Sequence, residues 1–229
     1  MYSLKKFRKI LEKFGLLKAT NIYENKGGWP GLRVLPKVDN LIDVGIGHQG
    51  SEGLYKFFPN SRKFFIDPLI ETKNAVEHHL KNSENKFYEC GVSSKQGEME
   101  LNVRTPISQS GFHVSESDSS RAVKKRSVKV NTLDNLFPRS VINGTWGIKI
   151  DVEGHEMEVL LGGVELIKHC DFVIVEVEIN KKKFSGSSKF GDIITWMLDM
   201  KFEVVALRVS GDGTDHLDVA FAREEYVGD

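Results

Sequence analysis

Short apolar runs alternate with stretches of helical periodicity along most of this chain. Such alternation predicts βαβ units built around a mainly parallel sheet. Buried strands are expected at residues 40–46, 63–68, 86–92, 145–151 and 170–179. Helices are expected at residues 50–58, 69–82, 152–163 and 189–200. Two last strand-like runs, residues 202–209 and 216–224, are expected to pair as a closing hairpin.

Two further segments, residues 97–103 and 126–133, alternate like half-exposed strands. The stretch between them is rich in serine and has little periodicity. A long loop inside a compact domain is usually functional or disordered. We interpret residues 105–121 as a candidate lid, in which Ser108, Ser110 and His113 are candidate contacts to a substrate.

The N-terminal residues 1–38 are interpreted as a helical extension, and residues 39–229 as the main domain. One helical face of the extension is apolar and the opposite face carries Lys and Arg. The apolar face consists of Leu4, Phe7, Ile10, Leu11 and Phe14. A helix docked on the domain is the expected arrangement, and peripheral contact with an anionic membrane surface is the alternative.

Composition limits the class of protein. The 229 residues suit one α/β domain, and 32 basic residues balance 32 acidic ones. A nucleic-acid-binding protein usually carries a basic excess, so no nucleic-acid partner is expected. No apolar run is long enough to span a bilayer, and the charged N-terminus does not read as a signal peptide. Cys90 and Cys170 are expected to be buried, reduced thiols, which favours a cytoplasmic location.

The run "LIDVGIGHQG" ends a strand in a turn with the spacing of a nucleotide-binding fingerprint, Gly-x-Gly-x-x-Gly. Asp43 precedes Gly45 and Gly47, and a carboxylate there would repel a diphosphate but attract an ammonium or sulfonium group. Asp67, at the end of the next strand, suits the hydroxyls of a ribose, which either kind of nucleotide contains. The turn therefore favours S-adenosylmethionine (SAM) over NAD.

A second acidic stretch, "GIKIDVEGHEMEVLLGG", places Asp151 at the carboxyl end of a strand, where ligands bind in open parallel sheets. Glu153 and Glu156 are expected to open the helix that follows, and His155 is a weaker candidate base. Asp151 together with Glu178 and Asn180 offers oxygen ligands that suit Mg²⁺, so a magnesium site is possible but not predicted.

Other charged residues are read as solvated. His78 and His79 are expected on different faces of one helix, exposed to water. The lysines at residues 181–183 are expected in a solvated loop rather than in a clamp for an acidic substrate.

Several stretches together resemble the FkbM-type methyltransferases, from about residue 40 to the end. They are "LIDVGIGHQG", "FFIDPL", "ECGVSSKQGEMELNV", "VKVNTLDNLF", "GIKIDVEGHEMEVLLGG" and "HLDVAFARE". The resemblance implies a class I methyltransferase Rossmann-like α/β fold. Its seven-stranded sheet would be mostly parallel with the last strand antiparallel, and helices would cover both faces.

The resemblance also implies a cofactor site for SAM. Asp43, Gly45 and Gly47 would hold the methionine part, and Asp67, followed by Pro68, would take the ribose. Gly91 and Val92 would border the adenine, and Asp151 would lie beside the transferred methyl group. Many members read Asp-Val-Gly-Ala-Asn-x-Gly at the turn, whereas Ile46-Gly47 stands here in place of Ala-Asn and the last glycine is displaced to Gly50.

The resulting hypothesis is a SAM-dependent O-methyltransferase acting on a hydroxyl of a small molecule or sugar. Asp151 or Glu153 is the expected base, with His155 third. The alternatives are an NAD-dependent oxidoreductase, a methyltransferase for a macromolecule, and a binding protein without turnover. The sequence indicates neither the oligomeric state nor the acceptor.

Overall fold

The computed structural model of this chain describes residues 22–23, 32, 34–120, 122–179, 184–209 and 216–226. The apolar face of the expected N-terminal helix lies outside the described residues, so the docking of that helix stays a prediction. Asn180, the lysines at residues 181–183, and Arg121 also lie outside them.

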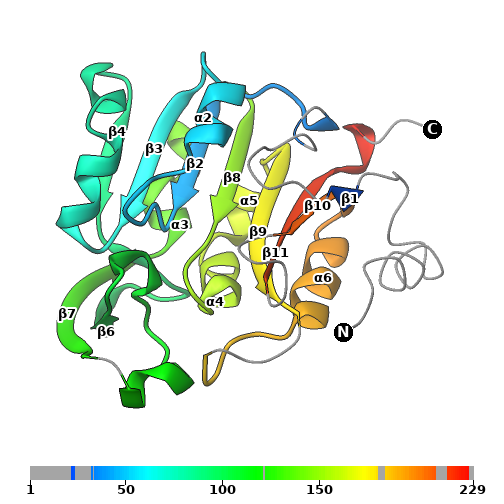
Figure 1. The fold of residues 1–229 in the computed structure, drawn as a ribbon. Coiled ribbons are helices and arrows are strands. Elements are labelled where there is room, and N and C mark those ends of the chain that lie inside the picture. Colours follow the sequence, from blue (N-terminus) through cyan, green and yellow to red (C-terminus); the bar gives the residue numbers. More distant parts are fainter. Residues whose placement is uncertain are drawn as a thin grey trace.

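An eight-stranded sheet forms the centre of the fold, in the order β1-β10-β11-β9-β8-β2-β3-β4 (Figure 1). Its strands are β1 (Ile22–Tyr23), β2 (Asn40–Val44), β3 (Arg62–Asp67), β4 (Lys86–Glu89), β8 (Trp146–Ile150), β9 (Phe172–Glu178), β10 (Phe202–Val209) and β11 (His216–Arg223). Only β11 runs antiparallel to its neighbours. Apart from the two-residue β1, this is the expected sheet, so the predicted mostly parallel sheet with an antiparallel last strand is confirmed.

Apolar residues fill both sides of this sheet because alternate residues of each strand point to opposite faces. On one side, Ile42 and Val44 belong to the cluster that includes residues of α3 (Leu133–Leu136), α4 (Glu156–Leu161), α5 (Val164–Ile167) and α6 (Phe190–Asp199). On the other side, Leu41 packs in the cluster that includes Leu54 of α2 (Glu52–Phe57). Strands buried on both sides explain why the sequence reads as continuous apolar runs.

A second, three-stranded sheet has the order β5-β7-β6, with β5 (Gly91–Val92), β6 (Gly97–Val103) and β7 (Lys124–Asn131). The single strand predicted at residues 86–92 is therefore wrong, because the run divides at Cys90 between β4 and β5. The Cys90 amide bonds to the Tyr88 carbonyl, which turns the chain toward the small sheet. Figure 1 shows this sheet beyond the carboxyl ends of β2 and β3.

The α-helix predicted at residues 69–82 is also wrong. The chain there forms two 3-10 helices, η2 (Ile70–Val76) and η3 (His79–Lys81). Side chains satisfy backbone groups that an α-helix would have used: the Thr72 hydroxyl donates to the Leu69 carbonyl, and the Asn85 amide donates to the His79 carbonyl. The remaining 3-10 helices are η4 (Ile107–Gln109), η5 (Glu116–Ser120), η6 (Arg139–Val141) and η7 (Glu224–Tyr226).

Cys90 and Cys170 are free thiols; Cys170 is buried as expected, whereas Cys90 is only partly buried. Among the described residues, no helix combines the length and the apolar character needed to cross a membrane.

Candidate functional site

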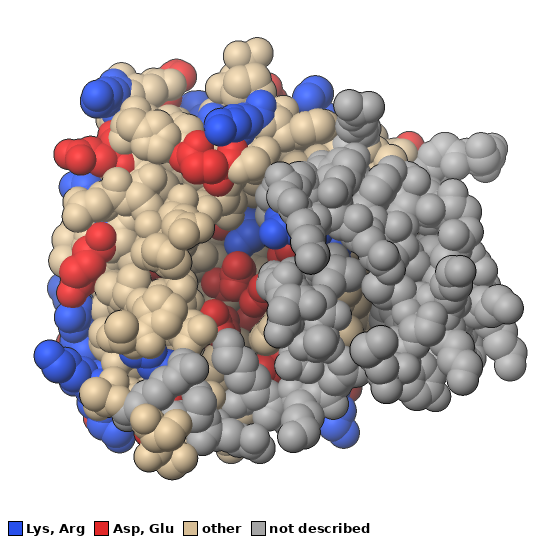
Figure 2. All heavy atoms as spheres, in the orientation of Figure 1, with Lys and Arg blue, Asp and Glu red and all other residues tan. Residues whose placement is uncertain are grey.

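A cavity of about 230 Å³ lies at the carboxyl ends of β2, β3, β8 and β9, where the small sheet faces the large one. Figure 2, which has the orientation of Figure 1, shows acidic side chains inside a hollow near the middle of the view. Most of the residues predicted from the sequence line this cavity, namely Gly45, Gly47, Asp67, Pro68, Gly91, Val92, Ser108, Ser110, Asp151 and Glu153. Asp43, His113 and His155 are not part of the lining.

The glycine turn, residues 45–50, requires its first glycine. Gly45 has a φ of 81°, and a Cβ there would lie 1.8 Å from the carbonyl oxygen of Asp151. Gly47 has a φ of 56°, and its amide donates to Asp67 across 3.2 Å. The turn is therefore pressed against the ends of both neighbouring strands, which leaves its backbone facing the cavity.

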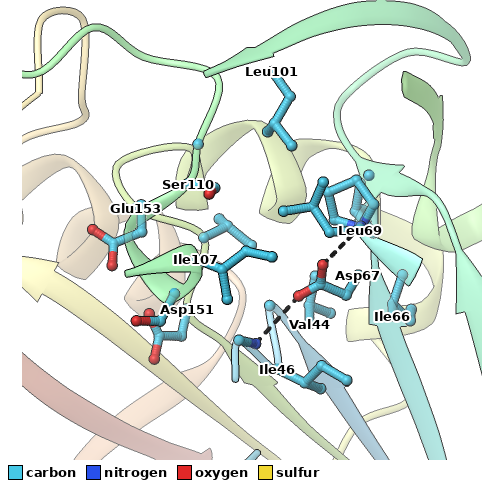
Figure 3. Close-up of a pocket in the computed structure, with 18 of the residues that line it drawn as sticks. Val44, Ile46, Ile66, Asp67, Leu69, Leu101, Ile107, Ser110, Asp151 and Glu153 are labelled. Carbon is cyan, nitrogen blue, oxygen red and sulfur yellow. Dashed lines mark hydrogen bonds between the residues drawn. The ribbon is translucent and has the colours of Figure 1, made fainter. Parts of the chain in front are cut away.

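Asp67 is held by two backbone amides, those of Gly47 and Leu69, which donate to its two carboxylate oxygens (Figure 3). Its side chain is buried at the cavity wall, and burial raises the pKa of Asp67 to about 6 despite these hydrogen bonds. Each oxygen keeps further acceptor capacity, so the carboxylate can accept hydrogen bonds from ligand hydroxyls.

Asp43 lies behind the cavity rather than in it. Its side chain is 1% exposed, accepts a hydrogen bond from the Tyr55 hydroxyl, and lies 3.9 Å from the Lys149 ammonium. The expected direct contact between Asp43 and a ligand does not match this geometry. Asp43 shares its face of β2 with Leu41, which packs toward α2, and it therefore lies beside Lys149 and outside the lining of the cavity.

Three carboxylates meet at the opposite wall of the cavity: those of Asp151, Glu153 and Glu176 offer ligand oxygens within 4.8 Å of one another. Figure 3 shows Asp151 and Glu153 across the cavity from Asp67. Lys149 pairs with Asp151 at 2.9 Å. Burial alone would raise the pKa of Asp151, but Lys149 outweighs burial and the pKa is lowered. Burial, Asp151 and Asp218 hold the pKa of Glu176 well above its ordinary value.

This group differs from the possible magnesium site. Glu178 accepts a hydrogen bond from the Ser187 hydroxyl and is not part of the lining, while Asn180 lies outside the described residues. The sequence places Glu176 near the carboxyl end of the same strand as Glu178, and in the structure Glu176 rather than Glu178 takes the position next to Asp151. Its signal in the sequence is a single carboxylate near the carboxyl end of β9, between the buried residues Val175 and Val177.

Glu153 lies in a turn before α4 rather than in its first turn. Its φ is 56°, and that of Gly154 is 95°. The helix starts at Glu156, whose carboxylate accepts hydrogen bonds from the amides of Val152 and Gly154. Burial raises the pKa of Glu156 to about 7. Glu156 thus closes the turn, and the turn directs Glu153 to the cavity.

His155 and His113 form a hydrogen-bonded pair beside the cavity. His113 Nδ1 bonds to the Ser185 carbonyl at 3.0 Å, and its Nε2 faces His155 Nδ1 at 3.1 Å. His155 Nε2 lies 3.0 Å from the Ser93 hydroxyl. A carbonyl only accepts, so His113 donates from Nδ1, His155 donates from Nδ1, and Ser93 donates to Nε2. Burial lowers the pKa of His155 to about 4, and His155 ties the lid to α4 rather than facing a substrate.

The predicted lid, residues 105–121, packs onto the cavity as far as it is described. A Cβ on Gly47 would lie 3.1 Å from Ser108 Cβ, and one on Gly91 would lie 2.7 Å from the Phe112 ring. Arg104, 3% exposed, holds the lid by donating to Asp118 and to the carbonyls of Gln109 and His113. Sequence reasoning missed Arg104, whose signal is a single cation at the end of an alternating strand.

A second cavity of about 360 Å³ adjoins the first and shares Gly45, Ile46, Gln49, Gly50 and Asp151 with it. Its other lining residues include Lys149, Arg208 and Asp218. Arg208 lies 3.4 Å from Asp218, and Lys149 is 5% exposed. The two cavities therefore meet at the glycine turn, one with an apolar and acidic lining and the other with charges of both signs.

The strand order, the single antiparallel strand and the glycine turn after β2 define the class I methyltransferase type of nucleotide-binding fold. The family described as the methyltransferase FkbM domain matches residues 33–204, and the chain belongs to this family. A relative, the hexuronic acid methyltransferase AglP of Haloferax volcanii, is 33% identical over 87 residues. That match covers 38% of this chain and 34% of AglP.

Solved structures with a similar arrangement are distant. Magnesium protoporphyrin IX methyltransferase from Synechocystis PCC 6803, with bound SAM, is 14% identical over 82% of this chain and 71% of that one, with a TM-score of 0.45. A didemethyltoxoflavin N1-methyltransferase from Burkholderia thailandensis is 11% identical over 85% of this chain and 76% of that one, with a TM-score of 0.44.

Proposed function

We propose that the chain is a SAM-dependent O-methyltransferase whose acceptor is a hydroxyl group of a sugar or another small molecule. The observation that carries the proposal is the pair of cavities that meet at the glycine turn of a chain belonging to the FkbM family. Family membership supports methyl transfer, and the lining residues support the cofactor.

The charges around the two cavities fit SAM better than NAD. Carboxylates exceed cations in the two linings even without Glu176, with Asp67, Asp151, Glu153, Asp218 and Glu52 against Lys149 and Arg208. A sulfonium and an ammonium group would be attracted by this excess, whereas a diphosphate would be repelled. These side chains reach the cavities, whereas Asp43 lines neither of them.

The two cavities also carry different polar groups, which would suit the nucleoside end and the amino-acid end of the cofactor. Asp67 would accept hydrogen bonds from the ribose, and Gly91 and Val92 would border the adenine. Lys149 and Arg208 in the second cavity would hold the carboxylate of the amino-acid end. Asp151 lines both cavities and would lie near the sulfonium.

The cofactor supplies an electrophilic methyl group when bound. Transfer of that methyl group from sulfur to the acceptor oxygen would leave S-adenosylhomocysteine (SAH) as the second product. A base must take the hydroxyl proton as the new bond forms. Asp151 is held as a charged partner of Lys149, which makes it a weaker base, so we assign the proton acceptor to Glu153. Positioning of the two reactants supplies most of the remaining rate enhancement.

The lid supports an acceptor with several hydroxyl groups. Ser108 and Ser110 bring hydroxyl groups to the same lining as Glu153 and suit hydrogen bonds to a sugar. AglP is named for a hexuronic acid, which is a sugar that carries hydroxyls and a carboxylate. A sugar is therefore the first class of acceptor to test.

Calorimetric titration with SAH and NAD in parallel tests the cofactor, and we expect SAH alone to bind. Tight NAD binding without SAH binding would refute the proposal. Methyl transfer is then measured with labelled SAM and a panel of neutral sugars, hexuronic acids, amines and carboxylates. Transfer only to amines would refute O-methylation while leaving the cofactor assignment intact.

Glu153→Gln and Asp151→Asn separate the two carboxylates. We expect Glu153→Gln to lose turnover by about 100-fold or more, the usual contribution of a general base, with SAH affinity unchanged. Asp151→Asn should weaken SAH binding. If Glu153→Gln turns over normally, Glu153 is not the proton acceptor.

A further inference from the structure

Two adjacent histidines and a glutamate converge at the start of α2. His78 Nε2 lies 3.1 Å and His79 Nε2 lies 2.9 Å from the same oxygen, Oε1 of Glu52. The expectation that these histidines point to different faces of one helix is wrong. His78 lies in the turn between η2 and η3 rather than inside a regular helix, and the two ring centroids lie 4.0 Å apart.

We propose that Glu52, His78 and His79 form a binding site for one divalent transition-metal ion of the Zn²⁺ type. Two imidazoles and one carboxylate are a recurrent protein ligand set for such ions. The site adjoins the second cavity, which Glu52 lines, but His78 and His79 line neither cavity, so a metal-binding test does not require methyl transfer.

The spacing of the ligand atoms fits a metal ion. All three atoms lie within 4.8 Å of one another. With metal–ligand bonds of about 2.0–2.1 Å, two ligands of a tetrahedral ion lie roughly 3.3 Å apart. The two observed nitrogen–oxygen distances, 2.9 and 3.1 Å, need to open by only a few tenths of an ångström to admit the ion.

His79 is held in place before any ion binds. Its ring makes edge contacts with Tyr55 at 4.9 Å and tilted contacts with Phe65 at 5.9 Å between centroids. These contacts aim Nε2 at Glu52 and reduce the ordering that metal binding would otherwise require.

His78 supplies the open side of the site. Its side chain is 57% exposed, compared with 20% for His79 and 36% for Glu52. Water can therefore complete the coordination shell, and the ion can enter from solvent. Nitrogen ligands favour Zn²⁺, Ni²⁺ or Co²⁺ over Mg²⁺, which prefers oxygen ligands.

The site would fasten the start of α2, directly after the glycine turn, to the segment between η2 and η3. An ion that binds the folded chain and not the unfolded one raises the unfolding temperature. A shift of the unfolding midpoint is therefore a readout that does not depend on methyl transfer.

The test titrates Zn²⁺ into the full chain, purified without a histidine tag, by calorimetry. We expect one equivalent to bind with a micromolar dissociation constant, and Mg²⁺ at millimolar concentration not to bind. His78→Ala and Glu52→Gln should each weaken Zn²⁺ binding at least tenfold. His169→Ala is the matched control, since His169 contacts Arg139 instead, and it should leave the affinity unchanged.

A spectrum of the Co²⁺ form adds a direct view of the ligands, and its visible bands should disappear in His78→Ala. Because the His78 side chain is largely exposed, the His78→Ala variant should fold normally. Loss of the Co²⁺ bands in this variant therefore reports the loss of a metal ligand. A dissociation constant for Zn²⁺ weaker than about 100 µM, the range of a weak surface site, would overturn the proposal. So would one-equivalent binding that neither variant changes.

Discussion

Asp67 is the residue whose replacement best separates cofactor binding from folding. The change is Asp67→Asn, which keeps the shape of the side chain and removes its charge. The Asn amide oxygen can still accept from the Leu69 amide, which lies 2.9 Å from Asp67. Its NH₂ group would then face the Gly47 amide, which now donates across 3.2 Å, and that pair would be lost.

Two effects on folding oppose each other. A pKa raised from 3.8 to about 6 means that burying the charged carboxylate costs roughly 3 kcal/mol at pH 7. The variant escapes this cost but leaves one amide unpaired, which costs about 1–3 kcal/mol. We expect the free energy of unfolding at pH 7 to stay level or to rise by up to about 2 kcal/mol. This advantage should fade as the pH falls from 6 toward 3.8, where the native carboxyl is protonated too.

Cofactor binding should change in the opposite direction. A hydrogen bond to a charged group contributes about 1.5–3 kcal/mol, so SAH should bind roughly 10- to 150-fold more weakly to the variant at pH 7. In the native chain, protonation of Asp67 below about pH 6 should weaken SAH binding by up to tenfold per pH unit. The variant should lack this dependence.

Calorimetric titration with SAH between pH 5 and pH 8, alongside urea unfolding of both proteins, measures the two effects. Equal SAH affinity of the two proteins at pH 7 would remove Asp67 from the cofactor site. A variant that unfolds several kcal/mol more easily would instead refute the balance between burial and hydrogen bonding.

Three further changes test the turn, the lid and the histidine pair. Gly45→Ala combines a φ of 81° with a Cβ 1.8 Å from the Asp151 carbonyl oxygen, and urea unfolding should show a loss of roughly 2–4 kcal/mol. Arg104→Lys breaks the forked pair with Asp118, so hydrogen exchange of residues 105–120 should accelerate by about 100-fold, matching roughly 3 kcal/mol. Because the pKa of His155 is lowered from 6.5 to about 4, its native form stays neutral while the unfolded form protonates. Unfolding free energy should therefore fall by roughly 2 kcal/mol from pH 7 to pH 5, and less in His155→Asn.

The large sheet could be predicted because its strands are buried on both sides and read as uninterrupted apolar runs. The position of the site followed from the rule that ligands bind at the carboxyl ends of parallel strands. Gly45, Asp67 and Asp151 each end or follow such a run, and all three line the cavity.

The structure places some residues differently from the sequence prediction, and the reasons are local. Asp43 stands before the same turn as Gly45, but its position in β2 points it toward α2, where Tyr55 binds it. Sequence spacing gave its distance from the turn and not the face on which it lies. The helical pattern predicts one continuous helix through His78 and His79, but a turn between η2 and η3 interrupts it at His78 and lets both side chains approach Glu52.

The small sheet was only half visible in the sequence. The strands β6 and β7 alternate clearly, but β5 pairs with β7 over two residues, too few to leave a pattern. The contacts of Arg104 with the lid depend on bringing Asp118 back over the strand end, which no local pattern encodes.

The connection from β6 to β7 belongs to the small sheet, whereas the glycine turn and Asp67 belong to the large one. That connection can change in length or composition without altering the register of β2 and the strands beside it. Under the proposed function, changes in this one hairpin can alter the acceptor specificity while the cofactor-binding site stays unchanged. Grafting the hairpin of a related enzyme onto this chain is thus a practical route to new methylated products.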